Sequence, residues 1–150
     1  MKREGKYPKA KVFGILQSGH HILVEEFVGE HSKGNGIYYR PIGGSIEFGE
    51  NSTEALKREF REEVKETVAI EDYLGCIENI FMINGRVGHE IILVYSVSFE
   101  EKENYTRKMF PIQESEQATF AKWIDIMDFL TGEKVLFPEG LVDKLERGNS

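Results

Sequence analysis

The segment from Gly43 to Glu66, GGSIEFGENSTEALKREFREEVKE, limits what this chain can fold into more than any other part of it. It begins with a Gly-Gly pair, continues through an Asn-Ser-Thr run that can start a helix, and ends in a strongly charged stretch. Leu56, Phe60 and Val64 recur at every fourth position, with Ala55 beside them. This spacing places them on one side of an α-helix, so the segment predicts an amphipathic helix with one buried stripe.

The same helix carries a second face that is acidic. Asn51 followed three residues later by Glu54 has the form of a capping box, so we expect the helix to run from about Ser52 to Lys65. The acidic face consists of carboxylates spaced i, i+3, i+4 and i+7, namely Glu59, Glu62, Glu63 and Glu66. Like charges at these spacings repel by roughly a few tenths of a kcal/mol per pair. A face that served stability alone would mix the two signs.

Length and charge limit the classes of function that this chain can have. With 150 residues, we expect one domain spanning residues 1–150. The net charge of −7, without a Lys/Arg cluster, argues against direct binding to duplex nucleic acid or to an anionic membrane. A phosphate-bearing ligand would therefore need bridging cations. Cys76 is the only cysteine, which excludes an internal disulfide and suits a reducing compartment.

The sequence shows neither an export signal nor a membrane span. The basic N-terminus is followed by a brief apolar run, 12–16, which Gly14 interrupts. The longest apolar stretch, 91–99, is about half of the ~20 residues that a membrane-spanning helix needs. We therefore expect a cytoplasmic protein.

Period-two patterns and turn residues predict a series of strands around the acidic helix. We expect them at 11–17, 21–27, 37–40, 68–70, 73–83, 89–99 and 119–124. The stretch 89–99 is apolar almost throughout, which is typical of a central strand covered on both faces. We expect loops at 29–36 and 100–116, a hairpin turn at Asn84-Gly85, a short helix at 126–130, and a final helix that Pro138 opens and that ends near Leu145. Together these elements define an α/β or α+β domain.

Seven residues of the opening segment stand at constrained spacings: Gly44, Glu50, Arg58, Glu59, Phe60, Glu62 and Glu63. They match a signature that runs Gly, five residues, Glu, seven residues, and then Arg-Glu-apolar-any-Glu-Glu-any-Gly-apolar. The chain therefore resembles the Nudix hydrolases. The strands on either side, Trp123 and the closing helix are also similar to that family. The resemblance implies a Nudix-type α/β/α sandwich with a mixed central sheet.

Two positions depart from the signature. Lys65 stands where the family has glycine, and Glu66 where it has an apolar residue. The glycine lets the chain leave the helix through a left-handed conformation, which a Lys enters only at a cost of roughly 1 kcal/mol. We therefore expect a rearranged exit, such as an extension of the helix.

The resemblance also implies a reaction and a metal cofactor. The reaction is cleavage of the diphosphate linkage of a nucleoside diphosphate joined to another group, by attack of water at phosphorus. Mg²⁺ or Mn²⁺ would serve it, since hard cations prefer oxygen ligands and carboxylates one helical turn apart can share them. The implied metal ligands are Glu59, Glu62, Glu63 and the carbonyl of Gly43. Glu50 would support them, and Arg58 would pair with Glu59 and hold its orientation.

The implied catalytic residues are Arg58, Glu62, Glu63 and Glu116. A carboxylate with a pKa of about 4.3 is a weak base near neutrality unless it is desolvated or the water is acidified by a metal. Glu63 is one candidate for the base. Many family members take another Glu from beyond the central strand, where this chain offers Glu100, Glu101, Glu103, Glu114 and Glu116. Of these we select Glu116 first and Glu100 second.

Candidate substrate-binding residues flank the Gly-Gly pair and end the strand at 73–83. Tyr38, Tyr39 and Arg40 either pack across strands or stack on a base and hold a phosphate. We select Tyr39, Arg40 and Phe81, with Met82 as a further wall. Apolar side chains select shape more than identity, so the nucleotide stays open. Some ADP-ribose hydrolases of the family carry a proline near this position, and its absence here disfavours ADP-ribose.

Two other functions remain as alternatives. Lys65 in place of glycine would suit a catalytically weak or inactive Nudix-fold module that binds or senses a nucleotide. A charged interaction domain without catalysis is the third interpretation, which the specific spacing disfavours. An isomerase of the same fold is also disfavoured, because no cysteine precedes Cys76. Homodimers are common in the family, and no patch in the sequence identifies an interface.

Overall fold

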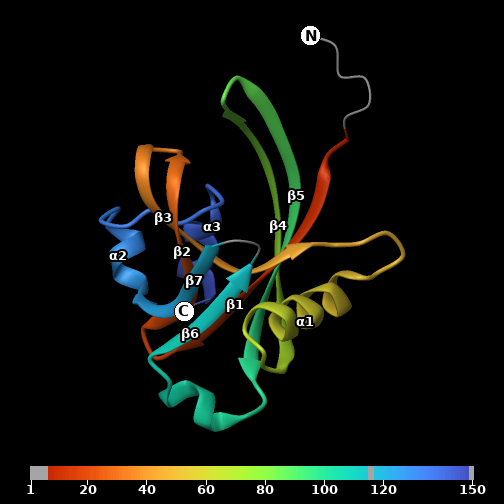
Figure 1. The fold of residues 1–150 in the computed structure, drawn as a ribbon, viewed down its shortest axis with the longest axis vertical. Helices are drawn as coiled ribbons and strands as arrows, with labels where there is room; N and C mark the ends of the chain where they lie inside the picture. The colour runs from red at the N-terminus through yellow and green to blue at the C-terminus, as the bar shows by residue number, and fades with distance from the viewer. Residues whose placement is uncertain (1–6, 115–116, 149–150) are drawn as a thin grey trace.

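The computed structural model describes residues 7–114 and 117–148, which form a mixed sheet covered by helices on both faces (Figure 1). Within these residues, seven strands join in the order β4-β5-β1-β3-β2-β7-β6. β1 runs parallel to β5, and the other neighbours are antiparallel. The strands are β1 (Lys9–Ser18), β2 (His21–His31), β3 (Gly34–Ser45), β4 (Val68–Ile83), β5 (Arg86–Phe99), β6 (Met109–Glu114) and β7 (Gln117–Asp125).

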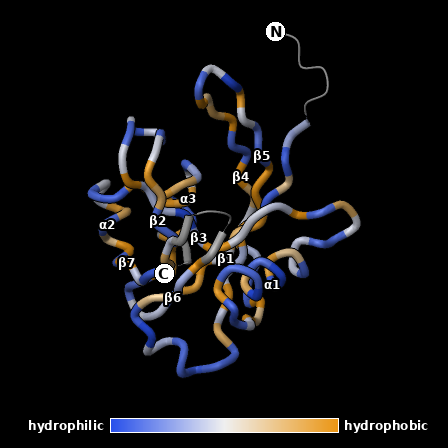
Figure 2. The backbone as a smooth tube through the Cα atoms, in the orientation of Figure 1, coloured by the Kyte–Doolittle hydropathy of each residue, from blue (hydrophilic) through white to orange (hydrophobic). Residues whose placement is uncertain are grey.

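Helix α1 (Ser52–Glu63) covers one face of the sheet, and its apolar stripe forms the core on that side. Its side chains Ala55, Leu56 and Phe60 are fully buried, so the predicted stripe is confirmed. Gly14 of β1 leaves room for the Phe60 ring, because a Cβ at position 14 would lie 2.9 Å from it. Figure 2 shows the hydrophobic residues gathered where the strands cross beneath α1.

Helices α2 (Ile126–Leu130) and α3 (Leu141–Gly148) cover the opposite face. Ile126, Phe129, Leu141 and Leu145 are buried there, in one cluster with Phe13 of β1. The layers therefore confirm the expected α/β/α sandwich. In the described part of the chain, no helix is long and apolar enough to cross a membrane.

Two hairpins project from the same end of the sheet (Figure 1). The β2–β3 hairpin stays paired from Val24 and Pro41 out to His31 and Gly34. The loop expected at 29–36 is therefore wrong, because backbone pairing continues through glycines and polar residues that carry no apolar pattern. In the β4–β5 hairpin, the Asn84-Gly85 turn is confirmed, with φ values of 52° and 74°.

Two other sequence-based boundaries are corrected. The expected loop at 100–116 contains a 3₁₀ helix, η1 (Lys102–Thr106), and β6, whose Phe110 and Ile112 are buried. The final helix starts at Leu141 and not at Pro138. The residues before Pro138 instead pair with β3, since Tyr39 N–H donates to Val135 O and Phe137 N–H donates to Tyr39 O, both at 2.8 Å.

The expected extension of α1 is also wrong, because Lys65 takes up the left-handed conformation that favours glycine, with φ of 66°. The helix ends at Glu63, and the N–H groups of Val64 and Lys65 both donate to Phe60 O, at 2.9 and 3.0 Å. The Lys65 ammonium donates to Glu62 O at 2.8 Å. A cation on the last carbonyls interacts favourably with the helix dipole, which offsets part of the backbone cost.

Glu66, the second departure from the signature, fastens the η1 segment to the end of α1. The side-chain amide of Asn104 donates to Glu66 Oε1 at 2.7 Å, and Arg107 Nη1 donates to Glu66 Oε2 at 3.3 Å. Arg107 in turn accepts a hydrogen bond from the Trp123 indole at its carbonyl, at 2.8 Å. At this position Glu66 therefore makes polar contacts, whereas the family signature has an apolar residue.

These contacts predict different effects for two substitutions of Lys65. Lys65→Met keeps the left-handed cost and removes the ammonium, so we expect it to lower the free energy of unfolding by about 0.3–1 kcal/mol. Lys65→Gly also removes the ammonium but relieves the backbone, so it should be about 1 kcal/mol more stable than Lys65→Met. Urea unfolding of the three proteins measures both differences. Equal stability of the two variants would contradict a left-handed residue 65.

Candidate functional site

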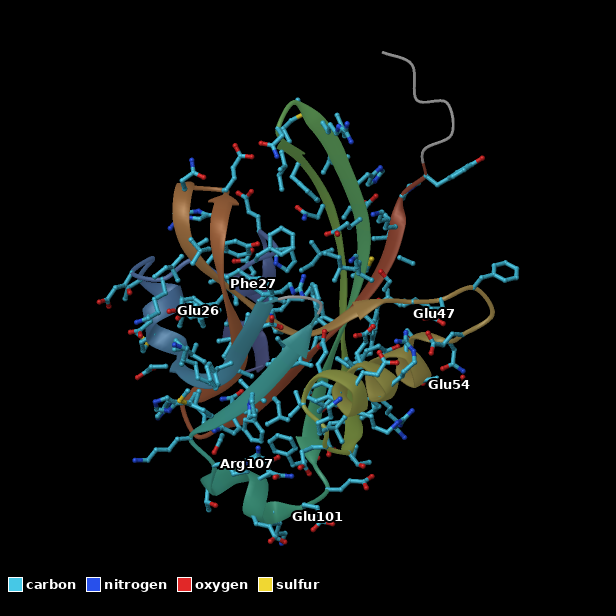
Figure 3. All side chains as sticks on the ribbon, viewed as in Figure 1. Glu26, Phe27, Glu47, Glu54, Glu101 and Arg107 are labelled. Atoms are coloured by element: carbon cyan, nitrogen blue, oxygen red, sulfur yellow. The ribbon has the colours of Figure 1, made fainter. Side chains whose placement is uncertain are left out.

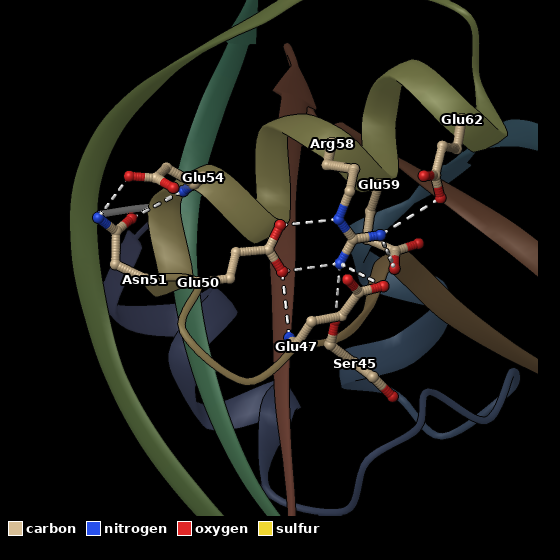
Figure 4. Close-up of polar contacts among 8 residues, drawn as sticks. All are labelled: Ser45, Glu47, Glu50, Asn51, Glu54, Arg58, Glu59 and Glu62. Carbon is tan, nitrogen blue, oxygen red and sulfur yellow. Dashed lines mark hydrogen bonds and ion pairs between the residues drawn. The ribbon is translucent and has the colours of Figure 1, made fainter.

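Arg58, in the middle of α1, is the centre of a hydrogen-bond network (Figure 4). Its Nε and Nη2 donate to the two oxygens of Glu50 at 2.8 and 2.9 Å, a bidentate pair. Its Nη1 donates to Glu59 at 3.1 Å and to Glu62 at 3.3 Å, and Nη2 also donates to Ser45 O at 3.0 Å. One guanidinium therefore ties the end of β3, the following loop and two turns of the acidic helix.

This network fixes the charge of its members. Hydrogen bonds from Arg58 first, and then from the backbone N–H of Glu47, lower the pKa of Glu50 to about 2. The same bond to Glu50, followed by the one to Glu59, raises the pKa of Arg58 above its already high value. Both groups are therefore charged at any pH at which the protein would work. The sequence implied Glu59 as the partner of Arg58, and the structure adds Glu50 at closer range.

The Gly-Gly pair makes room for a carboxylate beside the backbone. A Cβ on Gly44 would lie 2.6 Å from Glu59 Oε1, and one on Gly43 would collide with the carbonyl of Val12 and the ring of Phe13. Any other residue at these positions would displace Glu59 or separate β3 from β1. The two glycines therefore bring the last residues of β3 within contact distance of the acidic face.

The three carboxylates selected as metal ligands differ in exposure. Glu63 is 4% exposed and the side chain of Glu59 is 12% exposed, whereas the side chain of Glu62 is 60% exposed. Among the described residues, no three His, Cys, Asp or Glu side chains already converge on one point. The donors fit a hard divalent cation in kind, since all are carboxylate oxygens within two turns of one helix.

Of the candidate bases beyond the central strand, Glu100, Glu101 and Glu103 lie in or just before η1. Glu100 directly follows β5, and its N–H donates to Thr67 O at 3.1 Å, which places it close to the end of α1. Glu101, which precedes η1, and Glu103 within it are both exposed. Glu101 lies at the end of the molecule away from the two hairpins (Figure 3). Glu114 ends β6. Glu116, our first choice from the sequence, lies outside the described residues.

A cavity of about 430 Å³ is lined by residues of the two projecting hairpins and of the segment before α3. It brings Arg40 and Phe81 together, both selected from the sequence. Tyr39 does not line it: the side chain is 6% exposed, and its hydroxyl donates to Glu26 at 3.1 Å. Burial first, and then the Glu26 carboxylate, raise the pKa of Tyr39.

The alternation of side chains along β3 explains why Tyr38, and not Tyr39, lines the cavity. Side chains two residues apart in a strand share a face, so Tyr38 and Arg40 point the same way and Tyr39 points the other. Tyr38 accordingly lines the cavity with Arg40. The sequence contained this signal, because all three residues were expected on one strand.

Sequence reasoning selected none of four further residues as part of a site. Asn79 and Glu90 are directly opposite each other on β4 and β5 and both line the cavity, as does Phe137, which the pairing with β3 positions. Glu25 of β2 is 1% exposed and accepts a hydrogen bond from Thr119 Oγ1 at 2.9 Å. Alternation from Leu23 could have indicated that Glu25 faces inward, whereas nothing local singles out Asn79 or Phe137.

Comparisons with known proteins agree with the fold and the signature. The family model of the NUDIX domain matches residues 7–145. No curated protein sequence matches the chain. A NUDIX hydrolase from Nitrosomonas europaea is 16% identical with a TM-score of 0.67, the alignment covering 95% of this chain and 89% of that one.

Two further solved structures are similar over almost their whole length. The MutT protein from Methanosarcina mazei Go1 is 19% identical with a TM-score of 0.65, with 97% of this chain and 95% of that chain covered. The dihydroneopterin triphosphate pyrophosphohydrolase of E. coli is 15% identical with a TM-score of 0.64, with 95% and 97% covered. At such identities the likeness is one of fold.

Because the family model spans nearly all of the described residues, the chain belongs to the Nudix family. It is accordingly a member of the Nudix hydrolases by family.

The low pKa of Glu50 predicts how acid affects the Arg58 network. A carboxylate whose pKa is depressed on folding stabilises the folded state above its ordinary pKa, and this contribution is lost as the pH falls toward the folded value. The melting temperature of the native chain should therefore exceed that of Glu50→Gln at neutral pH. The difference should shrink as the pH falls from about 5 toward about 2. A difference that stays constant over this range would contradict the ion pair.

Proposed function

We propose that this Nudix hydrolase is a divalent-metal-dependent pyrophosphohydrolase that cleaves the diphosphate linkage of a nucleoside diphosphate joined to another group. The observation that carries the proposal is the position of Glu59. Its carboxylate lies against the backbone of Gly44 and is held by Arg58, at the end of a strand that also lines an aromatic cavity. An acidic site and a cavity of ligand size are therefore connected by β3.

Glu59, Glu62, Glu63 and the Gly43 carbonyl would hold Mg²⁺ or Mn²⁺, which supplies neutralisation of the diphosphate and a more acidic water. Arg58 keeps Glu59 and Glu62 oriented, and Glu50 keeps Arg58 in place. The attacking water forms a new bond to phosphorus as the bond from phosphorus to the bridging oxygen breaks. Glu63, the most enclosed of the three carboxylates, accepts the proton of that water, with Glu116 and Glu100 as the other candidate bases.

The cavity would receive the nucleoside. Tyr38, Phe81 and Phe137 provide aromatic rings, with centroids 6.3 Å apart for Tyr38 and Phe137 and 6.0 Å for Phe81 and Phe137. These rings pack edge to face against one another and form an aromatic wall of the cavity, on which a base can stack. The fold-level relatives include a dihydroneopterin triphosphate pyrophosphohydrolase and a UDP-X diphosphatase, whose names describe the same kind of bond cleavage.

The alternative of a catalytically weak nucleotide sensor rested on Lys65. Since Lys65 has a positive φ and the helix ends at Glu63, the backbone follows the course that a glycine would give it. The carboxylates that precede this exit are therefore not displaced by it, and the hydrolase is the better-supported function.

We expect hydrolysis that requires a divalent cation and depends on the acidic face. Release of phosphate or pyrophosphate should be measured for nucleotide sugars, dinucleoside polyphosphates, ADP-ribose and nucleoside triphosphates, with Mg²⁺, Mn²⁺ or EDTA. Glu62→Gln and Glu63→Gln should each lower kcat by about 10²-fold or more, since each removes a charge from the reacting centre.

Glu54→Gln is the matched control, because Glu54 is an exposed glutamate of the same helix whose side chain bonds only to Asn51 among the described residues. Its activity should be close to that of the native chain. Full activity in both Glu62→Gln and Glu63→Gln would refute the proposal.

A further inference from the structure

β4 lies at one end of the strand order, so one of its two backbone edges is open. Within the residues that the structure describes, β5 is the only strand that pairs with it. Backbone groups that point away from β5 therefore have no strand partner along a strand of 16 residues. We call residues 68–75 the inner half of β4 and residues 76–83, next to the turn with β5, its outer half. Figure 1 shows the outer half extending away from the helices.

The inner half of β4 carries the features by which proteins keep a strand edge from pairing with another chain. Its register against β5 is interrupted twice between residues 70 and 75. Glu71 and Asp72 are exposed at these interruptions. The Lys144 ammonium of α3 donates to Leu74 O at 3.2 Å and so covers part of the edge. Irregular register, exposed charge and a covering side chain all oppose the approach of a further strand.

The outer half lacks the charges and the irregular register. Its sequence is CIENIFMI, in which Glu78 is the single charged residue and which contains neither glycine nor proline. Its register against β5 runs without a shift from Cys76 to Ile83. Isoleucine and phenylalanine favour an extended strand. A regular, uncharged edge of this composition is a template for another strand, so the two halves of β4 differ in what they permit.

The outer half also presents apolar side chains to solvent. Ile80 is 67% exposed and Met82 is 60% exposed. They share a face of the strand with Val87 of β5, which is directly opposite Met82 and 39% exposed. Apolar side chains grouped on an exposed face are typical of an interaction surface. The outer half lines part of the cavity as well, so a contact here would adjoin the proposed substrate site.

Charge indicates which partner fits this edge. Two copies of one strand can pair antiparallel about a two-fold axis, the commonest symmetry of homodimers. Each chain carries a net charge of −7, so two copies repel unless they meet where charge is scarce. The outer half of β4 meets this condition, because Glu78 is its only charged residue.

An antiparallel pairing centred on Ile80 keeps the two carboxylates apart. Residue 77 then lies opposite residue 83 of the second copy, so seven residues of each strand pair. Glu78 lies opposite the partner's Met82, and like charges do not face each other. Ile80 lies opposite its own copy at the axis, which covers the most exposed apolar side chain of the segment.

We propose that the outer half of β4 is a homodimer interface, in which the strands of two copies pair antiparallel and join their sheets into one. The inference concerns assembly and does not rest on the proposed hydrolysis. A pairing of seven residues buries less than the roughly 1,200 Å² of a standard interface. The dimer is therefore weak, with a dissociation constant of roughly 1–100 µM.

Sedimentation of the full chain from about 1 to about 500 µM tests the dimer. The mean mass should rise from that of one chain toward that of two. Ile80→Lys places two ammonium groups opposite each other at the axis, so it should weaken the dimer about tenfold or more. Val28→Lys is the matched control, because Val28 is 78% exposed on the other hairpin, and it should dimerise as the native chain does.

Three results of this experiment would overturn the inference. One is a native chain that stays monomeric at the highest concentration. Another is a dimer that Ile80→Lys leaves intact, or that Val28→Lys dissociates equally. The last is growth beyond two copies, which a closed two-fold pairing does not allow.

Hydrogen exchange of the native chain tests the strand pairing without a substitution. Amides of residues 77–83 that point away from β5 lack a strand partner in one chain and gain one in the dimer. Their exchange should slow about fivefold between the lowest and the highest concentration, because the dimer is then the main species. Amides at the end of the β2–β3 hairpin should exchange at an unchanged rate. Slowing confined to any segment other than 77–83 would refute the proposed interface.

Discussion

The bidentate hydrogen bonds between Arg58 and Glu50 join a loop to a helix, and the rest of the acidic site depends on them. Asn51 caps the start of α1, since its side chain accepts from Glu54 N–H, so Glu50 stands just before the helix. An isolated run of glutamates on one helix would repel itself and move apart in water. Here the Arg58 guanidinium, itself held by Glu50, keeps Glu59 and Glu62 in a fixed arrangement near the end of β3.

The helix and its site were predictable because their signals are local. Capping, the apolar stripe and the carboxylate spacing all lie within one segment, so the acidic face follows from the residues themselves. The conformation of Lys65 was not predictable, because the intrinsic cost of a left-handed residue is of the same order as the gain from its contact with Glu62 O. Whether residue 65 is left-handed or continues the helix therefore depends on the folded geometry of the helix end.

Long-range pairing explains the remaining errors. The strand within 100–116 and the outer part of the β2–β3 hairpin are held by backbone pairing with another strand, which glycine and polar residues can also make although their β-propensity is low. The cavity shows the same limit. Asn79, Glu90 and Phe137 come from three parts of the chain, and their meeting depends on the register of β4 against β5 and of Tyr39 against Leu136.

The outer halves of the two hairpins have few neighbours, and this affects how the cavity moves. β1 pairs with β3 only along residues 42–45 of β3. Beyond them, β3 pairs with β2 for another eight register positions, from Val24–Pro41 to His31–Gly34. Backbone amides in such outer segments exchange with solvent through local opening rather than global unfolding. The two walls are therefore the parts of the sheet that can separate and close again while the Arg58 network stays fixed.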